Sequence, residues 1–224
     1  HKRIEIIQVK NIVIIGSGGL AKEVAFLIED INKNKMEWNL EGFIANDYTE
    51  ALENNKYNII GNDKWLIEQT RDLYVVFGIG SPQLIEKLAE KYLKNTSLKF
   101  PNLIHPNVVG DWDNILLGRG NIICAGNIFT TMISIGSFNY FNLSCTVGHD
   151  TTFGNFNIIN PSANISGGVC INNSILIGTG TQILQYKSLC DNCIVGAGSV
   201  VARDLEVRGT YIGIPAKIIH KDES

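Results

Sequence analysis

His149 has the surroundings of a general base. It is one of four histidines in the 224-residue chain, and it stands between Gly148 and Asp150 in the stretch TVGHDTTFG, residues 146–154. A neutral imidazole is the natural base near pH 7, and an adjacent carboxylate can orient the ring and stabilise the imidazolium ion. The alternative is a solvated histidine in a turn.

A second stretch with chemical potential is GSGGLA, residues 16–21, which follows an apolar run and opens a helical pattern. It fits G-x-G-x-x-A, a form that offers backbone amides and the positive end of a helix dipole to a phosphate. The alternative is a tight strand–helix turn. The ends of two further predicted strands, at 44–48 and 78–82, should reach the same edge of the sheet. The ligand-binding candidates at this edge are Gly16, Ser17, Gly18, Gly19, Leu20, Asn46, Asp47, Gly80 and Ser81.

The elements that position this edge alternate between strand and helix in the first half of the chain. Short apolar runs bounded by glycine or polar residues predict strands, and apolar residues three or four apart predict helices. Alternation of this kind is typical of a small parallel sheet with helices packed on it, so residues 1–104 are expected to form a Rossmann-like domain. The predicted strands are 11–15, 40–45, 57–60 and 73–80; the helices are 20–31, 63–70 (capped by Asp63) and 82–93; residues 98–104 close the half.

The second half, residues 105–224, follows a period of six. Every sixth position from Leu117 to Val195 is apolar, and the fourth residue after it tends to be small. Three hexads form one triangular coil of a parallel β-helix, with both kinds of residue pointing inward. From His105 to Val200 this gives about five coils and, at about 4.8 Å per coil, a rod of roughly 25 Å. The residue after each apolar position is expected to adopt left-handed backbone angles, because six of these residues are glycine: 118, 136, 148, 154, 178 and 196.

The same frame predicts what lies beside His149. One coil of 18 residues later the chain reaches Gly167 and Gly168. We expect bare backbone there, on which a thin ligand arm could lie. The tail, residues 207–224, is expected to cap or brace the end of the rod, since an open end exposes unpaired backbone.

Composition excludes several classes of protein. The net charge is −3 and the pI about 5.8, which does not favour nucleic-acid binding. No apolar run reaches the length of about 20 residues that spans a bilayer, and no signal-peptide pattern opens the chain, so we expect a cytoplasmic protein. The five cysteines are irregularly spaced, which predicts neither a disulfide framework nor a metal site.

Taken together, the motifs resemble one family. The glycine loop, the LIHP junction at 103–106, the hexapeptide coils, the outward histidine followed by an acid, and IGIPAK at 212–217 are combined in it. The chain is similar to the bacterial nucleotide-sugar acetyltransferases with hexapeptide repeats, of the bacillosamine and perosamine N-acetyltransferase type, together with the sialic acid O-acetyltransferases. The resemblance runs from about Ile12 to Lys217.

This resemblance implies a left-handed parallel β-helix and a homotrimer with active sites between subunits. It also implies acetyl-CoA as donor, no metal, and a UDP- or dTDP-linked amino sugar as acceptor. His149 matches the family's catalytic base and Asp150 the acid beside it, and the residues at the sheet edge match the site that holds the nucleotide sugar. Two family histidines are replaced here, by Leu20 in the glycine loop and by Ile158 nine residues after the base. The resemblance further assigns Asn142 to the acceptor, and Gly167, Gly168, Thr179 and Ala197 to the CoA arm.

We therefore expect an acetyltransferase in which His149 takes a proton from the amino group of a nucleotide-linked amino-deoxy sugar. The nearest alternative is O-acetylation of sialic acid or another sugar hydroxyl. A zinc hydratase on the same β-helix would need about three histidine ligands, of which the coils supply only one. A dinucleotide-dependent enzyme would need a second mononucleotide-binding half. A sugar-nucleotide-binding protein without catalysis would not bind acetyl-CoA.

Overall fold

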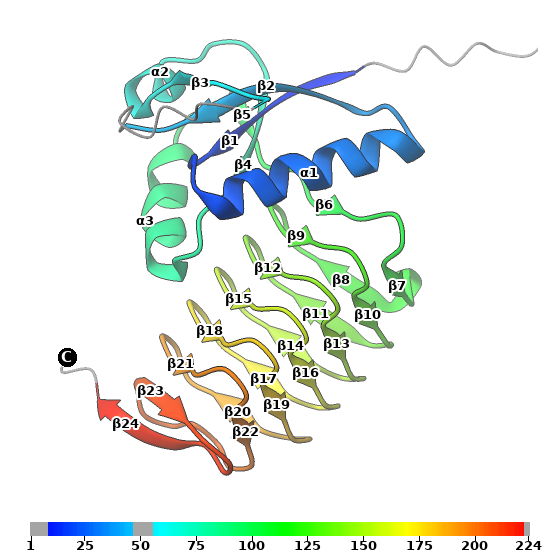
Figure 1. The fold of residues 1–224 in the computed structure, drawn as a ribbon, viewed down its shortest axis with the longest axis vertical. Coiled ribbons are helices and arrows are strands. Elements are labelled where there is room, and N and C mark those ends of the chain that lie inside the picture. The colour runs from blue at the N-terminus through cyan, green and yellow to red at the C-terminus, as the bar shows by residue number, and fades with distance from the viewer. Residues whose placement is uncertain (1–8, 47–55, 222–224) are drawn as a thin grey trace, which may run out of the picture. The chain divides into compact units, whose positions relative to one another are not determined.

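The computed structural model describes residues 9–46 and 56–221, and Figure 1 shows its ribbon. The chain divides into two compact units. The first holds the residues up to Ile79 together with Leu88–Pro101, and the second holds Gly80–Lys87 together with the chain from Asn102 onward.

The first unit is a parallel sheet with helices, as the alternation of patterns predicts. Its strand order is β3-β2-β1-β4-β5, which places β1 at the centre. All four residues Ile12–Ile15 of β1 are buried, as expected for a strand covered on both faces. The strands are β1 Lys10–Ile15, β2 Trp38–Ile44, β3 Ile59–Gly61, β4 Leu73–Phe77 and β5 Leu98–Lys99; the helices are α1 Gly19–Asn34, α2 Asp63–Ile67 and α3 Pro82–Tyr92, of which only the part from Leu88 belongs to this unit.

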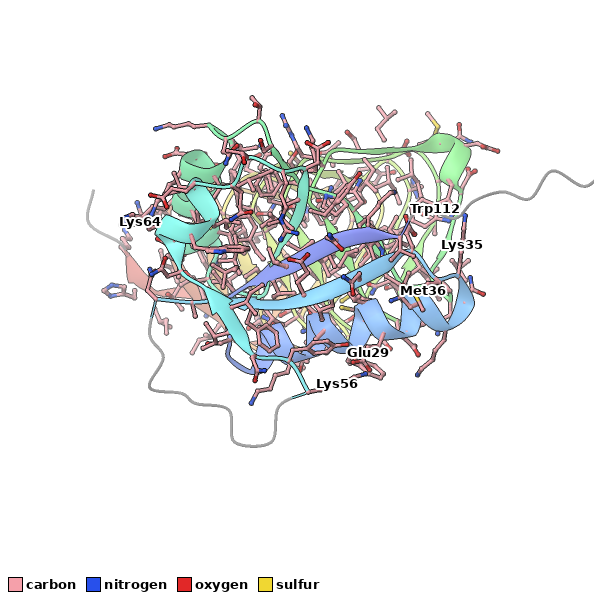
Figure 2. The ribbon with its side chains drawn as sticks, turned by 90° about the horizontal axis from the view of Figure 1, so that it is seen from above. Glu29, Lys35, Met36, Lys56, Lys64 and Trp112 are labelled. Carbon is pink, nitrogen blue, oxygen red and sulfur yellow. The ribbon has the colours of Figure 1, made fainter. Side chains whose placement is uncertain are left out.

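Helix α1 packs one apolar face on this sheet. Val24, Leu27 and Ile28 are buried, at the spacing that one face of a helix requires. On its outer side, Glu29 accepts hydrogen bonds from Lys56 at 2.8 Å and Tyr57 at 2.9 Å, and Figure 2 shows Glu29 and Lys56 side by side. The hydrogen bond from Lys56 lowers the pKa of the Glu29 carboxyl despite its partial burial. The pair thus ties α1 to the chain that enters β3.

The predicted cap of the second helix is wrong. Helix α2 ends at Ile67 and is capped by Asn62, whose side chain accepts a hydrogen bond from the Trp65 amide at 3.0 Å. Asp63 is the first helical residue, and its carboxylate accepts hydrogen bonds from Lys91 at 2.7 Å and from the Tyr92 hydroxyl. Burial raises the pKa of Asp63, but these hydrogen bonds outweigh it and leave the pKa lowered. Asp63 therefore joins α2 to α3.

The second unit is a left-handed parallel β-helix, whose rungs are stacked from β6 to β22 in Figure 1. Strands pair in parallel with strands one coil away, for example Thr146 with Asn164 and Val147 with Ile165. This confirms the 18-residue coil. One sheet contains β7 Val109–Gly110, β10 Ile128–Phe129, β13 Thr146–Val147, β16 Asn164–Ile165, β19 Gln182–Ile183 and β22 Val200–Val201. Another contains β8 Ile115–Leu117, β11 Ile133–Ile135, β14 Thr152–Phe153, β17 Cys170–Ile171 and β20 Ser188–Leu189.

The third sheet includes both ends of the β-helix. It begins with β6, which belongs to the coils because it pairs with β9. At the other end, β23 pairs in parallel with β21 and antiparallel with β24, so the tail extends this sheet beyond the last coil. A short 3₁₀ turn, Trp112–Asn114, precedes β8. The strands are β6 Leu103–Ile104, β9 Ile122–Ile123, β12 Tyr140–Phe141, β15 Ile158–Ile159, β18 Leu176–Ile177, β21 Ile194–Val195, β23 Gly209–Ile212 and β24 Lys217–Lys221.

The interior follows the predicted alternation of large and small residues. The small residues expected to point inward are all buried: Cys145, Thr151, Ala163, Val169, Thr181, Cys193 and Ser199. Between them lies a stack of large apolar side chains, in which Phe141 makes edge-to-face contacts with Phe129 and Phe153 at centroid distances of 5.1 and 5.0 Å.

The predicted positions of the left-handed residues are wrong. Left-handed angles occur three residues after each inward apolar residue, for example at Phe138 (φ 60°) and Asp150 (φ 57°), and not at Gly148 or Gly154. These glycines have another function: a Cβ on Gly148 would lie 2.5 Å from the Gly167 nitrogen, and one on Gly154 would lie 2.7 Å from the Asn172 oxygen. Glycine is used there because the next coil passes too close for a side chain.

Buried asparagines connect successive coils at one corner. The side-chain oxygen of Asn121 accepts from the amide of Asn139 at 2.9 Å, and that of Asn139 accepts from the amide of Asn157 at 3.0 Å. Asn157 accepts in turn from the amide of Ile175. Each side chain thus satisfies a buried amide one coil away, and the ladder stabilises a corner that lacks strand pairing.

Candidate active site

His149 lies at a corner of the β-helix between β13 and β14. Its Nδ1 is 2.7 Å from Oδ2 of Asp150, and the two side chains are 55% and 62% exposed. Asp150 holds left-handed angles, which Asp tolerates better than most residues. An Nδ1–H group that donates to the carboxylate leaves the lone pair on Nε2 free for a proton. The pair therefore has the arrangement of a base and its orienting acid.

The imidazole lies against Gly167, one coil further along. The His149 carbonyl accepts a hydrogen bond from the Gly168 amide at 2.7 Å, which fixes the two coils in register. A Cβ on Gly167 would lie 2.6 Å from Nε2. The predicted glycine backbone does lie beside His149, and Gly167 and Gly168 are partly buried. The pattern did not predict that the imidazole lies against Gly167 and the ring of Tyr186 against Gly168. Glycine at 167 leaves the space that the imidazole occupies.

Three of the predicted residues lie at a different corner. Asn142 follows β12, Thr179 follows β18 and Ala197 follows β21, and these strands belong to one sheet. The side-chain oxygen of Asn142 accepts from the Leu143 amide at 2.8 Å, and Thr179 and Ala197 are exposed. Within one chain, therefore, only Gly167 and Gly168 of the predicted donor residues stack beside His149.

The glycine loop joins β1 to α1 and is open to solvent. Gly18 is the N-cap of α1 and supplies no side-chain cap, so the first amides of the helix remain available to an anion. A Cβ on Gly18 or Gly19 would meet no atom within 4 Å, whereas one on Gly16 (φ 105°) would lie 2.8 Å from the Gly78 oxygen. Gly16 thus permits the close turn, and Gly18 and Gly19 leave the helix end uncovered. Ser17 and Leu20 of the same loop are partly buried.

The other predicted residues of this edge are partly engaged in the fold. The Asn46 side chain accepts a hydrogen bond from the Asp63 amide at 3.1 Å, and Asp47 lies outside the described residues. Gly80 is exposed, and the Ser81 hydroxyl accepts from the Leu84 amide at 3.3 Å in the first turn of α3. A role in ligand binding for Asn46 or Ser81 therefore remains a prediction.

Two of the five cysteines, Cys145 and Cys193, are not placed as nucleophiles. Burial raises the pKa of Cys145 to about 11 and that of Cys193 to about 12, so both are thiols at neutral pH. Cys190 Sγ lies 3.3 Å from Cys193 Sγ. Within residues 9–46 and 56–221, no group of three or more His, Cys, Asp or Glu side chains could hold a metal ion. In the same residues, no helix is both long and apolar enough to cross a membrane.

Comparison with known proteins connects both units to one group of enzymes. Residues 11–92 match the PglD N-terminal domain family. The fold is similar to perosamine N-acetyltransferase from Caulobacter crescentus, solved with CoA and GDP-perosamine, at a TM-score of 0.83 and 29% identity. This match covers 96% of the present chain and 99% of the other. The whole chain is therefore similar to a nucleotide-sugar N-acetyltransferase, and its first unit matches the PglD N-terminal domain family.

Two further solved structures have the same fold as the present chain. The acetyltransferase domain of PglB from Neisseria gonorrhoeae, in complex with acetyl coenzyme A, matches with a TM-score of 0.86 and 24% identity over 95% of this chain and all of the other. WeeI from Acinetobacter baumannii matches with a TM-score of 0.80 and 24% identity over 94% of this chain and all of the other. These two matches confirm the fold expected from the sequence. The match to perosamine N-acetyltransferase, solved with CoA, confirms the expected resemblance and the acyl-CoA-dependent class of enzyme.

Proposed function

We propose that the chain transfers the acetyl group of acetyl-CoA to the amino group of a nucleotide-linked amino-deoxy sugar, with His149 as general base. The observation that carries this proposal is the 2.7 Å contact between Nδ1 of His149 and the Asp150 carboxylate at an exposed corner. It leaves Nε2 as the acceptor of a proton. The related perosamine N-acetyltransferase, which was solved with a nucleotide-linked sugar and CoA, supports this choice of substrates.

The reaction needs one proton transfer through the imidazole. The acceptor nitrogen attacks the thioester carbonyl, and Nε2 of His149 takes the proton that this nitrogen loses. The carbon–nitrogen bond forms, the carbon–sulfur bond breaks, and the imidazolium returns the proton to the departing thiolate. Asp150 keeps the ring in the required tautomer and stabilises its positive charge. A sugar hydroxyl would react by the same steps, as O-acetylation of sialic acid requires.

The glycine loop is proposed to hold the phosphates of the acceptor. Its support is the uncapped N-terminus of α1, where a Cβ on Gly18 or Gly19 would meet none of the described atoms within 4 Å. A helix end of this kind binds phosphate through its amides and its dipole. The loop therefore favours a nucleotide-linked sugar over a free sugar.

We also propose that the enzyme is a homotrimer and works in the cytoplasm. Thr179 and Ala197 lie at a different corner from His149 in one chain. In a trimer, that corner of a neighbouring subunit can form the second wall of the donor site. Light scattering should give three times the 24.7 kDa mass of the chain, and a fully active monomer would refute the trimer.

The test of function is an acceptor screen with release of free CoA as the readout. UDP-, dTDP- and GDP-linked amino sugars are compared with free sialic acid, each with acetyl-CoA. We expect turnover with an amino sugar nucleotide and loss of that turnover in His149→Ala. Turnover with sialic acid alone would replace N-acetylation by O-acetylation. If the protein binds acetyl-CoA but turns over none of these acceptors, the proposed acceptor class is wrong.

A further inference from the structure

The corner that carries His149 continues through the later coils of the β-helix. The amide of Gly168 donates to the His149 carbonyl, and the amide of Tyr186 donates to the Gly167 carbonyl at 3.0 Å. The last coil is shorter, and its Asp204 side chain accepts from the Ser188 amide at 2.9 Å. One edge of the molecule therefore presents His149, Gly167, Gln185 and Arg203 in succession.

Tyr186 is more exposed than an aromatic residue at a corner of this β-helix needs to be. It holds left-handed angles (φ 58°), is 69% exposed, and lays its ring over Gly168. Aromatic residues at the equivalent position of another corner are packed instead: Phe138 stacks on Phe156 at a centroid distance of 5.6 Å and is only 4% exposed. The Tyr186 ring thus offers an apolar surface on the same edge as His149.

The charges on this edge favour one direction for an anionic ligand. On the N-terminal side of His149, the Asp111 carboxylate accepts a hydrogen bond from Thr131, and this bond lowers the pKa of Asp111 and favours its charged form. On the C-terminal side lies the exposed Arg203; the carboxylate of its neighbour Asp204 accepts a hydrogen bond from the Ser188 amide. A ligand that carries phosphates would therefore extend from His149 toward Arg203.

The distance along this edge matches the donor. Three coils separate His149 from Arg203, which is about 14 Å at the usual strand spacing. The extended pantetheine arm of CoA measures about 15 Å from sulfur to the first phosphate, at roughly 1.2 Å per bond of an extended chain. When the thioester of acetyl-CoA lies next to Nε2 of His149, the phosphates of CoA therefore reach the coil that carries Arg203.

We propose that Tyr186 and Arg203 bind the donor: the Tyr186 ring packs against the pantetheine arm, and the Arg203 guanidinium binds a phosphate of CoA. The inference rests on the proposed function for the identity of the donor. It goes beyond that function by assigning two side chains, in addition to backbone, to donor affinity.

The first test compares two arginine variants by calorimetric titration of the full-length protein with CoA and with pantetheine, which lacks the phosphates. Arg203→Gln should weaken CoA about tenfold, the usual loss when a hydrogen bond to a charged group is removed, and should leave pantetheine unchanged. The control is Arg119→Gln, an exposed arginine at a corner on the other side of the coil. An equal CoA affinity in both variants would overturn the role of Arg203.

The second test concerns the ring. Tyr186→Ala should weaken CoA and pantetheine by the same factor, about five- to tenfold, because the apolar surface of the ring no longer covers the arm. Tyr186→Phe should retain most of the affinity. Met132→Ala is the matched control, because Met132 is left-handed (φ 57°) and 59% exposed at the same corner on the other side of His149. An effect of Met132→Ala as large as that of Tyr186→Ala would overturn the direction of the arm.

Failure of this inference is distinguishable from failure of the proposed function. If the wild-type protein binds no CoA, the donor is wrong and both fall. If the wild type binds CoA and both Tyr186→Ala and Arg203→Gln bind it equally well, only the assignment of these residues falls. Neither titration needs an acceptor, so an incorrect acceptor affects neither result.

Discussion

A single methyl group at residue 167 should disable the proposed base without unfolding the protein. In Gly167→Ala, the new Cβ would lie 2.6 Å from Nε2, 2.7 Å from Cε1 and 2.9 Å from Cδ2 of His149. Gly167 is absent from the left-handed region, so alanine fits its backbone. The imidazole, which is more than half exposed, can swing away into solvent and relieve the contact.

The expected loss of rate follows from the size of that movement. Non-bonded carbon and nitrogen atoms are comfortable at about 3.5–4.0 Å, so the ring must move by about 1 Å. A misplacement of about 1 Å in a catalytic group can cost about 10²-fold in rate. Complete removal of a general base costs about 10²–10⁴-fold. Gly167→Ala should therefore lower kcat to a level near that of His149→Ala.

Steady-state kinetics of a double-mutant cycle provide the assay. If the methyl acts through the ring, Gly167→Ala adds no further loss in the His149→Ala background. The melting temperature of His149→Ala should stay unchanged, because truncation of an outward side chain leaves no cavity. Asp150→Asn should cost less than His149→Ala, since Asn keeps the left-handed backbone and removes only the carboxylate. Independent, additive losses in the double variant, or a Gly167→Ala enzyme with wild-type kcat, would refute the reasoning.

Three further predictions concern other parts of the chain. Gly18→Val should raise the acceptor KM and spare the affinity for acetyl-CoA; equal loss of both would mean that the loop serves the fold. Asn139→Ala strands the amide of Asn157 and should cost about 2–4 kcal/mol, a fall in melting temperature of about 5–10 °C, whereas an unchanged unfolding curve would show the ladder to be dispensable. Burial raises the pKa of Cys145 and Cys193, so iodoacetamide at pH 8 should label the partly exposed Cys170 in the folded protein and leave these two unmodified, which peptide mass spectrometry can check.

The β-helix could be predicted because its repeat leaves little freedom. An apolar residue every six positions must point inward, and 18 residues per coil then place Gly167 beside His149 by arithmetic. The observed pairing of Val147 with Ile165 has this register. What the pattern could not show was why glycine recurs. Glycine is required at 148 and 154 because the next coil approaches too closely for a side chain. A left-handed backbone also favours glycine, so the sequence alone does not show which of the two causes applies.

Side-chain placement at the corners was beyond prediction for a related reason. Left-handed positions in this chain hold Phe138, Phe156 and Tyr186, residues that local preference would not put there. Tertiary stacking overrides that preference at Phe138 and Phe156. The frame showed that the chain near residue 167 was bare of side chains, but not that the imidazole itself would cover it. In the first unit, the helix cap is Asn62 and not Asp63. Both residue types are good N-caps and they are adjacent, so the sequence alone does not show which of them caps the helix.

The position of the proposed base constrains which residue can assist it. Four successive coils have a left-handed residue at this corner (Met132, Asp150, Gly168 and Tyr186), and the one that directly follows His149 is Asp150. An orienting acid at that place must tolerate positive φ and carry a carboxylate. Aspartate meets both requirements at low cost, whereas glutamate has a longer side chain that does not favour the left-handed region. The geometry of the corner therefore selects a histidine–aspartate pair. Both side chains point outward, so their identity does not affect the packing of the buried residues that stabilise the rod. The proposed chemistry and the stability therefore depend on different residues of the same hexad.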